Sequence, residues 1–169
     1  MIQVHTVGSD KVYQIWKDVE GYLKASIETN TGDCTIDQLK VLLVEGKQTL
    51  LLGIEDDKIV GAMTVEFVNY PNERVMFITA LGGKGVVNNE TFSQVETWAK
   101  LQGATKSAAW AKEAQARLYQ QKAGFTTMRY VMEKKLSVAA AVAVVHKIAR
   151  IPPIQPTYLS TLNRFTKSC

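Results

Sequence analysis

The sequence predicts a single mixed α/β domain with a mostly antiparallel sheet and about four helices, followed by an extended arm. Strand-like and helix-like patterns follow one another through residues 1–136. Two strand-like runs meet at Asp56 and Asp57, as in an antiparallel hairpin. Beyond residue 136 a short apolar run and three prolines replace these patterns. We therefore expect a domain over residues 1–136 and an arm over residues 137–169.

The size and charge of the chain support one domain with a basic end. The chain has 169 residues, 46% of them hydrophobic and 21% charged, which is enough for one buried core and too little for two ordinary domains. The net charge is +4, and after Glu133 there are six basic residues and no acidic residue. A basic arm can meet nucleic acid, an acidic protein surface or a membrane surface, or it can remain solvated.

Several classes of site and location are not indicated. Cys34 and Cys169 are too few and too far apart for a disulfide scaffold or a metal cluster. His5 and His146 have no partner at ligand spacing, so we expect no metal site and no nucleophilic triad. The N-terminus lacks the pattern of a signal peptide, which predicts an intracellular protein when it is made. The apolar run 138–145 is well short of the ~20 residues that cross a bilayer, so no membrane span is expected.

The first third of the chain predicts a strand and two helices. Apolar and polar side chains alternate over residues 1–7, which is typical of a strand. Residues 12–27 carry apolar side chains at three- and four-residue spacing, which predicts a helix with one buried face. Thr35 can cap a shorter helix that ends at Gly46. Both helices are expected to contribute to the core.

The middle of the chain predicts three consecutive antiparallel strands. Residues 49–55 and 58–69 form the predicted hairpin, and a turn at residues 70–73 leads into a third strand that begins at Arg74. This apolar strand runs into the glycine-rich segment 82–85. A turn between a strand and a helix is a place where backbone N–H groups can converge on a phosphate.

The last part of the domain predicts a helix, a strand, a helix and a strand. The first of these helices starts near residues 89–90 and ends at Gly103. A strand is predicted near Trp110, a helix runs through Tyr119, and a final alternating strand ends at Leu136. The helix that follows the glycine-rich segment is expected to point its N-terminus at that segment.

This order of elements resembles the GNAT acyltransferase family, in which a glycine turn after the fourth strand holds the pyrophosphate of acetyl-CoA. The resemblance covers most of residues 1–136 and implies a sheet that is splayed near Ala80 and Trp110. It is carried by Leu81-Gly82-Gly83-Lys84-Gly85, Trp98-Ala99, Gly103, Trp110-Ala111 and Gly124-Phe125. In these motifs the chain is most similar to the compact GNAT-like proteins encoded by tailed phages.

The resemblance implies that Gly83, Lys84 and Gly85 would hold the pyrophosphate if the protein binds acetyl-CoA. The family's cradle is an Arg or Gln, two residues, a Gly, one residue, and a Gly or Ala. With its first glycine set on Gly85, Gly82 stands at the Arg or Gln position and Val87 at the last position. Only the middle glycine matches. A tight turn between strand and helix also explains these glycines.

The acid and the base of an acyl transfer are not provided by clear motifs. Aligned on Gly124 and Phe125, Gln120 stands where the family has its tyrosine, and a glutamine cannot donate a proton to a departing thiolate. Tyr119 is the candidate acid, but adjacent helix residues point about 100° apart, so packing is its favoured role. The candidate bases lie in no motif and are expected on solvated surfaces. They are Glu28, Glu66 and Glu73.

These departures predict a GNAT-fold protein with a degenerate acetyl-CoA site that acts as a structural or interaction component of a larger assembly. The similarity to phage proteins suggests a virion as that assembly, made in the cytoplasm of the host. The alternative is an active acetyl-CoA-dependent N-acyltransferase. No cofactor is expected in the first case, and acetyl-CoA is expected in the second.

The arm is the predicted partner-binding element. Apolar side chains return at helical spacing after the prolines and are expected to bind other proteins of the assembly or another copy of this chain. The residues proposed for this contact are Ile154, Tyr158, Leu159, Leu162 and Phe165. Binding of nucleic acid by the arm is a weaker alternative, because the arm offers few basic groups and two aromatic side chains.

Overall fold

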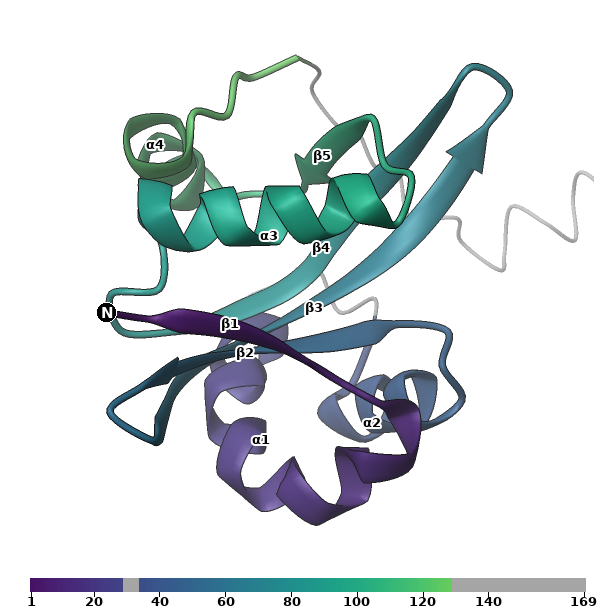
Figure 1. The fold of residues 1–169 in the computed structure, drawn as a ribbon, viewed down its shortest axis with the longest axis vertical. Helices are drawn as coiled ribbons and strands as arrows, with labels where there is room; N and C mark the ends of the chain where they lie inside the picture. The colour runs from purple at the N-terminus through teal and green to yellow at the C-terminus, as the bar shows by residue number, and fades with distance from the viewer. Residues whose placement is uncertain (29–33, 129–169) are drawn as a thin grey trace, which may run out of the picture. The chain divides into compact units, whose positions relative to one another are not determined.

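The structure is a computed structural model, and it describes residues 1–28 and 34–128 (Figure 1). Met1–Thr127 forms one compact unit. The predicted final strand, the arm and its partner-binding residues lie outside the described residues. No helix in the described part is long and apolar enough to cross a membrane.

The described elements follow the predicted order. The strands are β1 (Gln3–Val7), β2 (Thr49–Glu55), β3 (Lys58–Tyr70), β4 (Glu73–Gly83) and β5 (Lys106–Ala109). The helices are a 3₁₀ turn, η1 (Ser9–Lys11), and α1 (Val12–Glu28), α2 (Ile36–Val44), α3 (Asn89–Leu101) and α4 (Glu113–Ala123). The predicted mixed α/β fold with a mostly antiparallel sheet is confirmed.

The five strands form one sheet in the order β1-β2-β3-β4-β5. Neighbouring strands are antiparallel except for β4 and β5, which are parallel. Helices α1 and α2 lie on one side of the sheet, and α3 and α4 lie on the other (Figure 1). Because successive side chains of a strand point to opposite faces, β2 supplies Leu50 and Leu52 to the α1/α2 side and Leu51 to the α3 side. The continuous apolar run of β2 is therefore buried on both faces.

Local capping explains where two of the helices begin. The Thr35 side chain accepts a hydrogen bond from Gln38 N, and the Gln38 side chain accepts one from Thr35 N, so the predicted cap of α2 is confirmed as a capping box. The Asn88 side chain caps α3 by accepting a hydrogen bond from Thr91 N. The Asn88 cap fixes the start of α3 just after the glycine-rich segment.

A bulge and a splay interrupt the regular sheet on β4. Val65 pairs with Ile78 but Thr64 pairs with Ala80, so Thr79 is an extra residue without a partner on β3. The β4–β5 ladder ends at Ile78, whereas β4 continues to Gly83. The two strands therefore lose their pairing near Ala80 and Trp110, where the splay was predicted.

The glycine-rich segment differs from its prediction in one respect. Gly82 and Gly83 were predicted in the turn after the strand, but both lie within β4. The turn is formed by residues 84–88 instead. The reason is tertiary, because each of these glycines lies against the backbone of a neighbouring element.

Candidate functional site

The candidate anion site is the turn from the end of β4 to the start of α3. Gly85 has φ +75°, and the space around its missing side chain is open. Lys84 is exposed, and its N–H donates to Val60 O at 3.3 Å. The amides of Gly85, Val86 and Val87 donate no hydrogen bond to another described residue. Amides of this kind, next to a helix N-terminus, are what an anion requires.

The segment 84–90, which includes this turn, carries no net charge. Lys84 is the basic residue of the segment 84–90, and Glu90 is its acidic residue. Glu90 lies in the first turn of α3, where a carboxylate already interacts favourably with the positive end of the helix dipole. Asn88 uses its amide on the protein itself, since Nδ2 donates to Gly85 O at 2.8 Å and Oδ1 accepts from Thr91 N at 2.9 Å. A pyrophosphate would meet one lysine and one opposing carboxylate here.

Gly82 and Gly83 are packed against neighbouring backbone. A Cβ built on Gly82 would overlap the carbonyl oxygen of Tyr22 in α1 and lie 2.6 Å from the carbonyl carbon. A Cβ on Gly83, which has φ +135°, would lie 2.5 Å from the Cα of Gly61 in β3. Both glycines therefore allow close approach of β4 to its neighbours. Position 82 has no room for the arginine or glutamine that the family carries there.

A side chain of α1 occupies one amide of β4 beyond the splay. Leu81 lies past the end of the β4–β5 ladder, and its N–H donates to Ser26 Oγ at 3.3 Å. An extended ligand in the splay would have to compete with this bond. The Ser26 contact could not be predicted from the sequence, because a single serine in an amphipathic helix has many ordinary roles.

A polar cluster surrounds the bulge. The hydroxyls of Thr64 and Thr79 lie 2.7 Å apart, and Thr79 Oγ1 also lies 2.8 Å from Gln48 Oε1. Thr64 is fully buried. Because a hydroxyl has one proton, Thr64 donates to Thr79, and Thr79 donates to the Gln48 amide oxygen or to Thr64 O. These residues were not predicted as a cluster, since isolated threonines in strands are ordinary strand formers.

Tyr119 lies in an aromatic cluster that joins α4 to α3. Its ring centroid is 5.4 Å from that of Phe125 and 6.1 Å from that of Phe92. Phe92 and Phe125 are 5.7 Å apart with their rings edge-on. Burial raises the pKa of Tyr119 above its usual value of 10. Gln120 is exposed and donates to Thr127 Oγ1. The surroundings of Tyr119 are those of a packing residue, and its role as an acid stays a prediction.

The three candidate bases are in different environments. Glu28 forms an ion pair with Lys24 at 3.8 Å, and Glu73 forms one with Lys106 at 2.5 Å. Glu66 is half-buried on β3, and within the described chain it forms no ion pair. It pairs across the sheet with Phe77, whose ring lies 5.1 Å from the ring of Trp110. Of the candidate bases on the sheet, Glu66 is therefore the one nearest in register to the end of the β4–β5 ladder.

Residues 1–28 and 34–128 contain no cluster of metal-binding side chains. No group of three or more His, Cys, Asp or Glu side chains in this part of the chain could hold a metal ion. His5 lies on β1, and Cys34 Sγ donates a hydrogen bond to Thr35 O at 3.2 Å.

Comparisons with known proteins agree with the architecture. No protein-family model and no curated protein matches the sequence. Similar solved structures include an aminoglycoside acetyltransferase from an uncultured soil metagenomic sample, with a TM-score of 0.59, 11% identity, and coverage of 80% of this chain and 97% of that one. A protein from Clostridium acetobutylicum described as a predicted acetyltransferase, solved with acetyl-CoA, has a TM-score of 0.57 at 13% identity and coverage of 80% and 96%.

A third similar structure is a ribosomal-protein-alanine N-acetyltransferase from Brucella melitensis, with a TM-score of 0.57, 8% identity, and coverage of 81% of this chain and 99% of that one. Likeness at such low identity concerns the fold alone. The element order, the splay between β4 and β5 and these three structures lead to one conclusion. The described domain has the fold of the GNAT acetyltransferases.

Proposed function

We propose that this protein uses the GNAT fold as a structural or interaction component of a larger assembly, and that its acetyl-CoA site is degenerate. The observation that carries the proposal is the packing of Gly82 against the α1 backbone. This packing leaves no room for the Arg or Gln side chain with which the family begins its pyrophosphate cradle. A virion is the assembly that we favour, from the resemblance of the motifs to phage-encoded proteins.

The charges and hydrogen bonds around the turn support the same proposal. Lys84 and Glu90 leave the segment 84–90 without net charge, and the Asn88 side chain already caps α3. Beyond the splay, the Leu81 amide is bonded to Ser26. Charge-assisted contacts are the strong ones in phosphate recognition, and this turn offers a single basic side chain for them.

Calorimetric titration of the purified protein with acetyl-CoA tests this proposal. We expect no binding tighter than ~100 μM, because a working cradle would have to contribute at least ~5 kcal/mol. Two charge-reversal variants are matched controls: Lys84→Glu at the turn and Lys100→Glu at the far end of α3. Tighter binding that Lys84→Glu abolishes and Lys100→Glu preserves would contradict a degenerate site.

The alternative is an active acetyl-CoA-dependent N-acyltransferase. It is favoured by the splay between β4 and β5 and by the amides of the turn at Gly85. In that case Gly83, Lys84 and Gly85 would hold the pyrophosphate and Tyr119 would be the acid. The same titration separates this alternative from the first proposal.

The arm is the proposed contact with the assembly. Removal of residues 151–169 deletes every proposed partner-binding residue and is expected to abolish assembly while the domain stays folded. Light scattering would measure assembly, and circular dichroism would measure folding. An unchanged complex would contradict a role for the arm. Binding to nucleic acid that weakens steeply with salt would favour the third possibility instead.

A further inference from the structure

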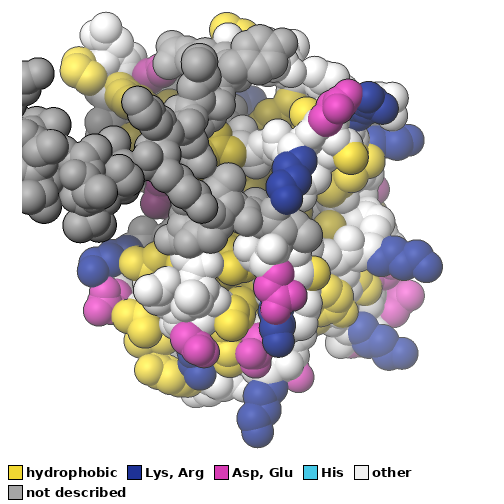
Figure 2. Space-filling model, turned by 180° about the vertical axis from the view of Figure 1, so that it is seen from behind, with side chains coloured by type: hydrophobic (Ala, Val, Ile, Leu, Met, Phe, Trp, Pro, Cys, Tyr) yellow, Lys and Arg dark blue, Asp and Glu magenta, His cyan; other side chains and the backbone are white. Residues whose placement is uncertain are grey.

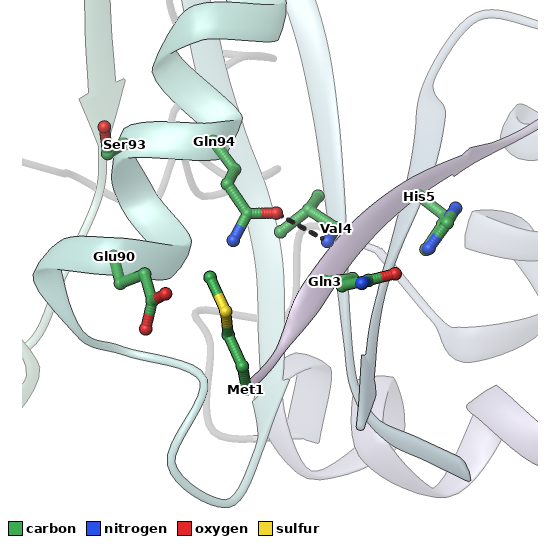
Figure 3. A pocket seen from close by; sticks show the side chains of 7 residues that line it. All are labelled: Met1, Gln3, Val4, His5, Glu90, Ser93 and Gln94. Carbon is green, nitrogen blue, oxygen red and sulfur yellow. Dashed lines mark hydrogen bonds between the residues drawn. The ribbon is translucent and has the colours of Figure 1, made fainter. Parts of the chain in front are cut away.

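The outer edge of β1 is partly covered by one side chain of α3. β1 is an edge strand of the described sheet, and an open groove of about 560 Å³ lies between it and α3 (Figure 3). Gln94 reaches across from α3 to the strand. Its Oε1 accepts from Val4 N at 2.9 Å, and its Nε2 donates to Ile2 O at 2.9 Å. The side-chain amide thus bonds to the edge as the peptide group of a neighbouring strand would.

These bonds identify the backbone groups that face outward. In an antiparallel ladder, the N–H and C=O of one residue point to the same side, and the side alternates from residue to residue. Ile2, Val4 and Thr6 therefore face outward, whereas Gln3 and His5 face β2. Gln94 uses two of the outward groups. The C=O of Val4 and the backbone groups of Thr6 have no hydrogen-bond partner among the described residues.

β1 lacks the usual protections of an edge strand. Natural edges are blunted by charged side chains, by proline or by bulges. The sequence of β1 is QVHTV, which contains no Asp, Glu, Lys, Arg or Pro, and its ladder with β2 is regular. The remaining protection in the described structure is α3, through the Gln94 amide. Both hydrogen bonds come from one side chain, so one substitution can remove them.

We propose that the outer edge of β1 is a self-association surface that the Gln94 amide keeps closed, and that its partner is a second copy of this chain. The outward groups are self-complementary about Val4. An antiparallel pair would place Val4 opposite Val4 of the second copy and Ile2 opposite Thr6, and it would bring no like charges together. The groove gives the second strand room to approach. This inference does not depend on the fate of the acetyl-CoA site.

Gln94→Ala in the full-length protein tests the proposal. Without the amide we expect the dissociation constant of the dimer, measured by sedimentation velocity, to fall at least about tenfold, or about 1.4 kcal/mol. Hydrogen exchange at the Thr6 amide should slow as the protein concentration rises. Ser93→Ala is the matched control, because Ser93 also lines the groove but its side chain makes no bond to β1.

A second substitution checks that the edge itself pairs. Thr6→Lys places a charge on the exposed edge and should return the Gln94→Ala protein to the association of the wild type. If Gln94→Ala does not fold, Gln94→Ser repeats the test with a polar side chain that is too short to reach β1. Unchanged association and exchange in the folded variant would overturn the proposal. Slow Thr6 exchange that depends on concentration in the wild type would overturn the closed state.

Discussion

Gly82→Ala is expected to destabilise the domain by about 3 kcal/mol, at the upper end of the usual cost of overpacking. The added methyl group would overlap the carbonyl oxygen of Tyr22. That oxygen belongs to the backbone of α1, so it cannot turn aside as the end of a side chain can. Relief requires α1 to move away from β4, and α1 carries Val19 and Leu23, which are fully buried. The substitution therefore disturbs the core as well as the contact.

Urea unfolding followed by circular dichroism measures this effect. Gly21→Ala is the matched control, because position 21 lies inside α1 with nothing within 4 Å of a new Cβ. Alanine there should stabilise the helix by roughly 0.5–1 kcal/mol. The two variants add the same methyl group, one against the backbone of Tyr22 and the other into open space on the adjacent residue of α1. A Gly82→Ala protein as stable as the wild type would show that α1 can move away from β4 without loss of core packing.

Gly82 also indicates the limit of the sequence-based predictions. The order of the elements was predicted from local signals. These are the three- and four-residue spacing of apolar side chains in α1, the hairpin around Asp56 and Asp57, and the cap at Thr35. Each of these signals acts within a few residues, so it can be read along the chain. A glycine required by the approach of a distant helix looks the same in sequence as a glycine required by a turn. Gly82 and Gly83 were assigned to the turn for that reason.

The details of the candidate site were beyond prediction for the same kind of reason. The bulge at Thr79 shifts the pairing of β4 by one residue, and neither strand alone records a shift between them. The hydrogen bonds from the Gln94 side chain to the backbone of Ile2 and Val4 join residues about ninety positions apart in the sequence. A glutamine on a helix surface is ordinary until the edge strand beneath it is known. The splay, by contrast, was predicted through the resemblance of the whole order of elements.

Tyr119→Ala is expected to destabilise the domain by roughly 2–4 kcal/mol, and Tyr119→Phe by less than about 1 kcal/mol. The reason is that the ring of Tyr119 packs between α3 and α4, against Phe92 and Phe125. Alanine removes the ring, whereas phenylalanine keeps it. Urea unfolding at neutral pH measures both variants. Equal losses in the two proteins would contradict a packing role for the ring.

The pH dependence of stability isolates the hydroxyl of Tyr119. Burial raises the pKa of this hydroxyl in the folded protein, whereas in the unfolded chain it ionises near its usual value of about 10. Above that pH the unfolded state loses the proton first, so stability is complete below it and falls as the pH rises through the folded pKa. Tyr119→Phe should remove this part of the alkaline loss. An identical alkaline profile in the two proteins would mean that the hydroxyl is solvated in the folded state.

The same pair of variants separates packing from acid catalysis at Tyr119. An acid that protonates a leaving thiolate acts through its hydroxyl, so phenylalanine would abolish acetyl transfer and leave stability almost unchanged. A packing residue acts through its ring, so phenylalanine would preserve both. The alanine variant cannot make this distinction, because loss of the ring loosens α4 from α3 and lowers any activity indirectly. If Tyr119→Phe eliminates a measurable acetyl transfer, Tyr119 is the acid of an active N-acyltransferase. The proposal of a degenerate acetyl-CoA site would then be wrong.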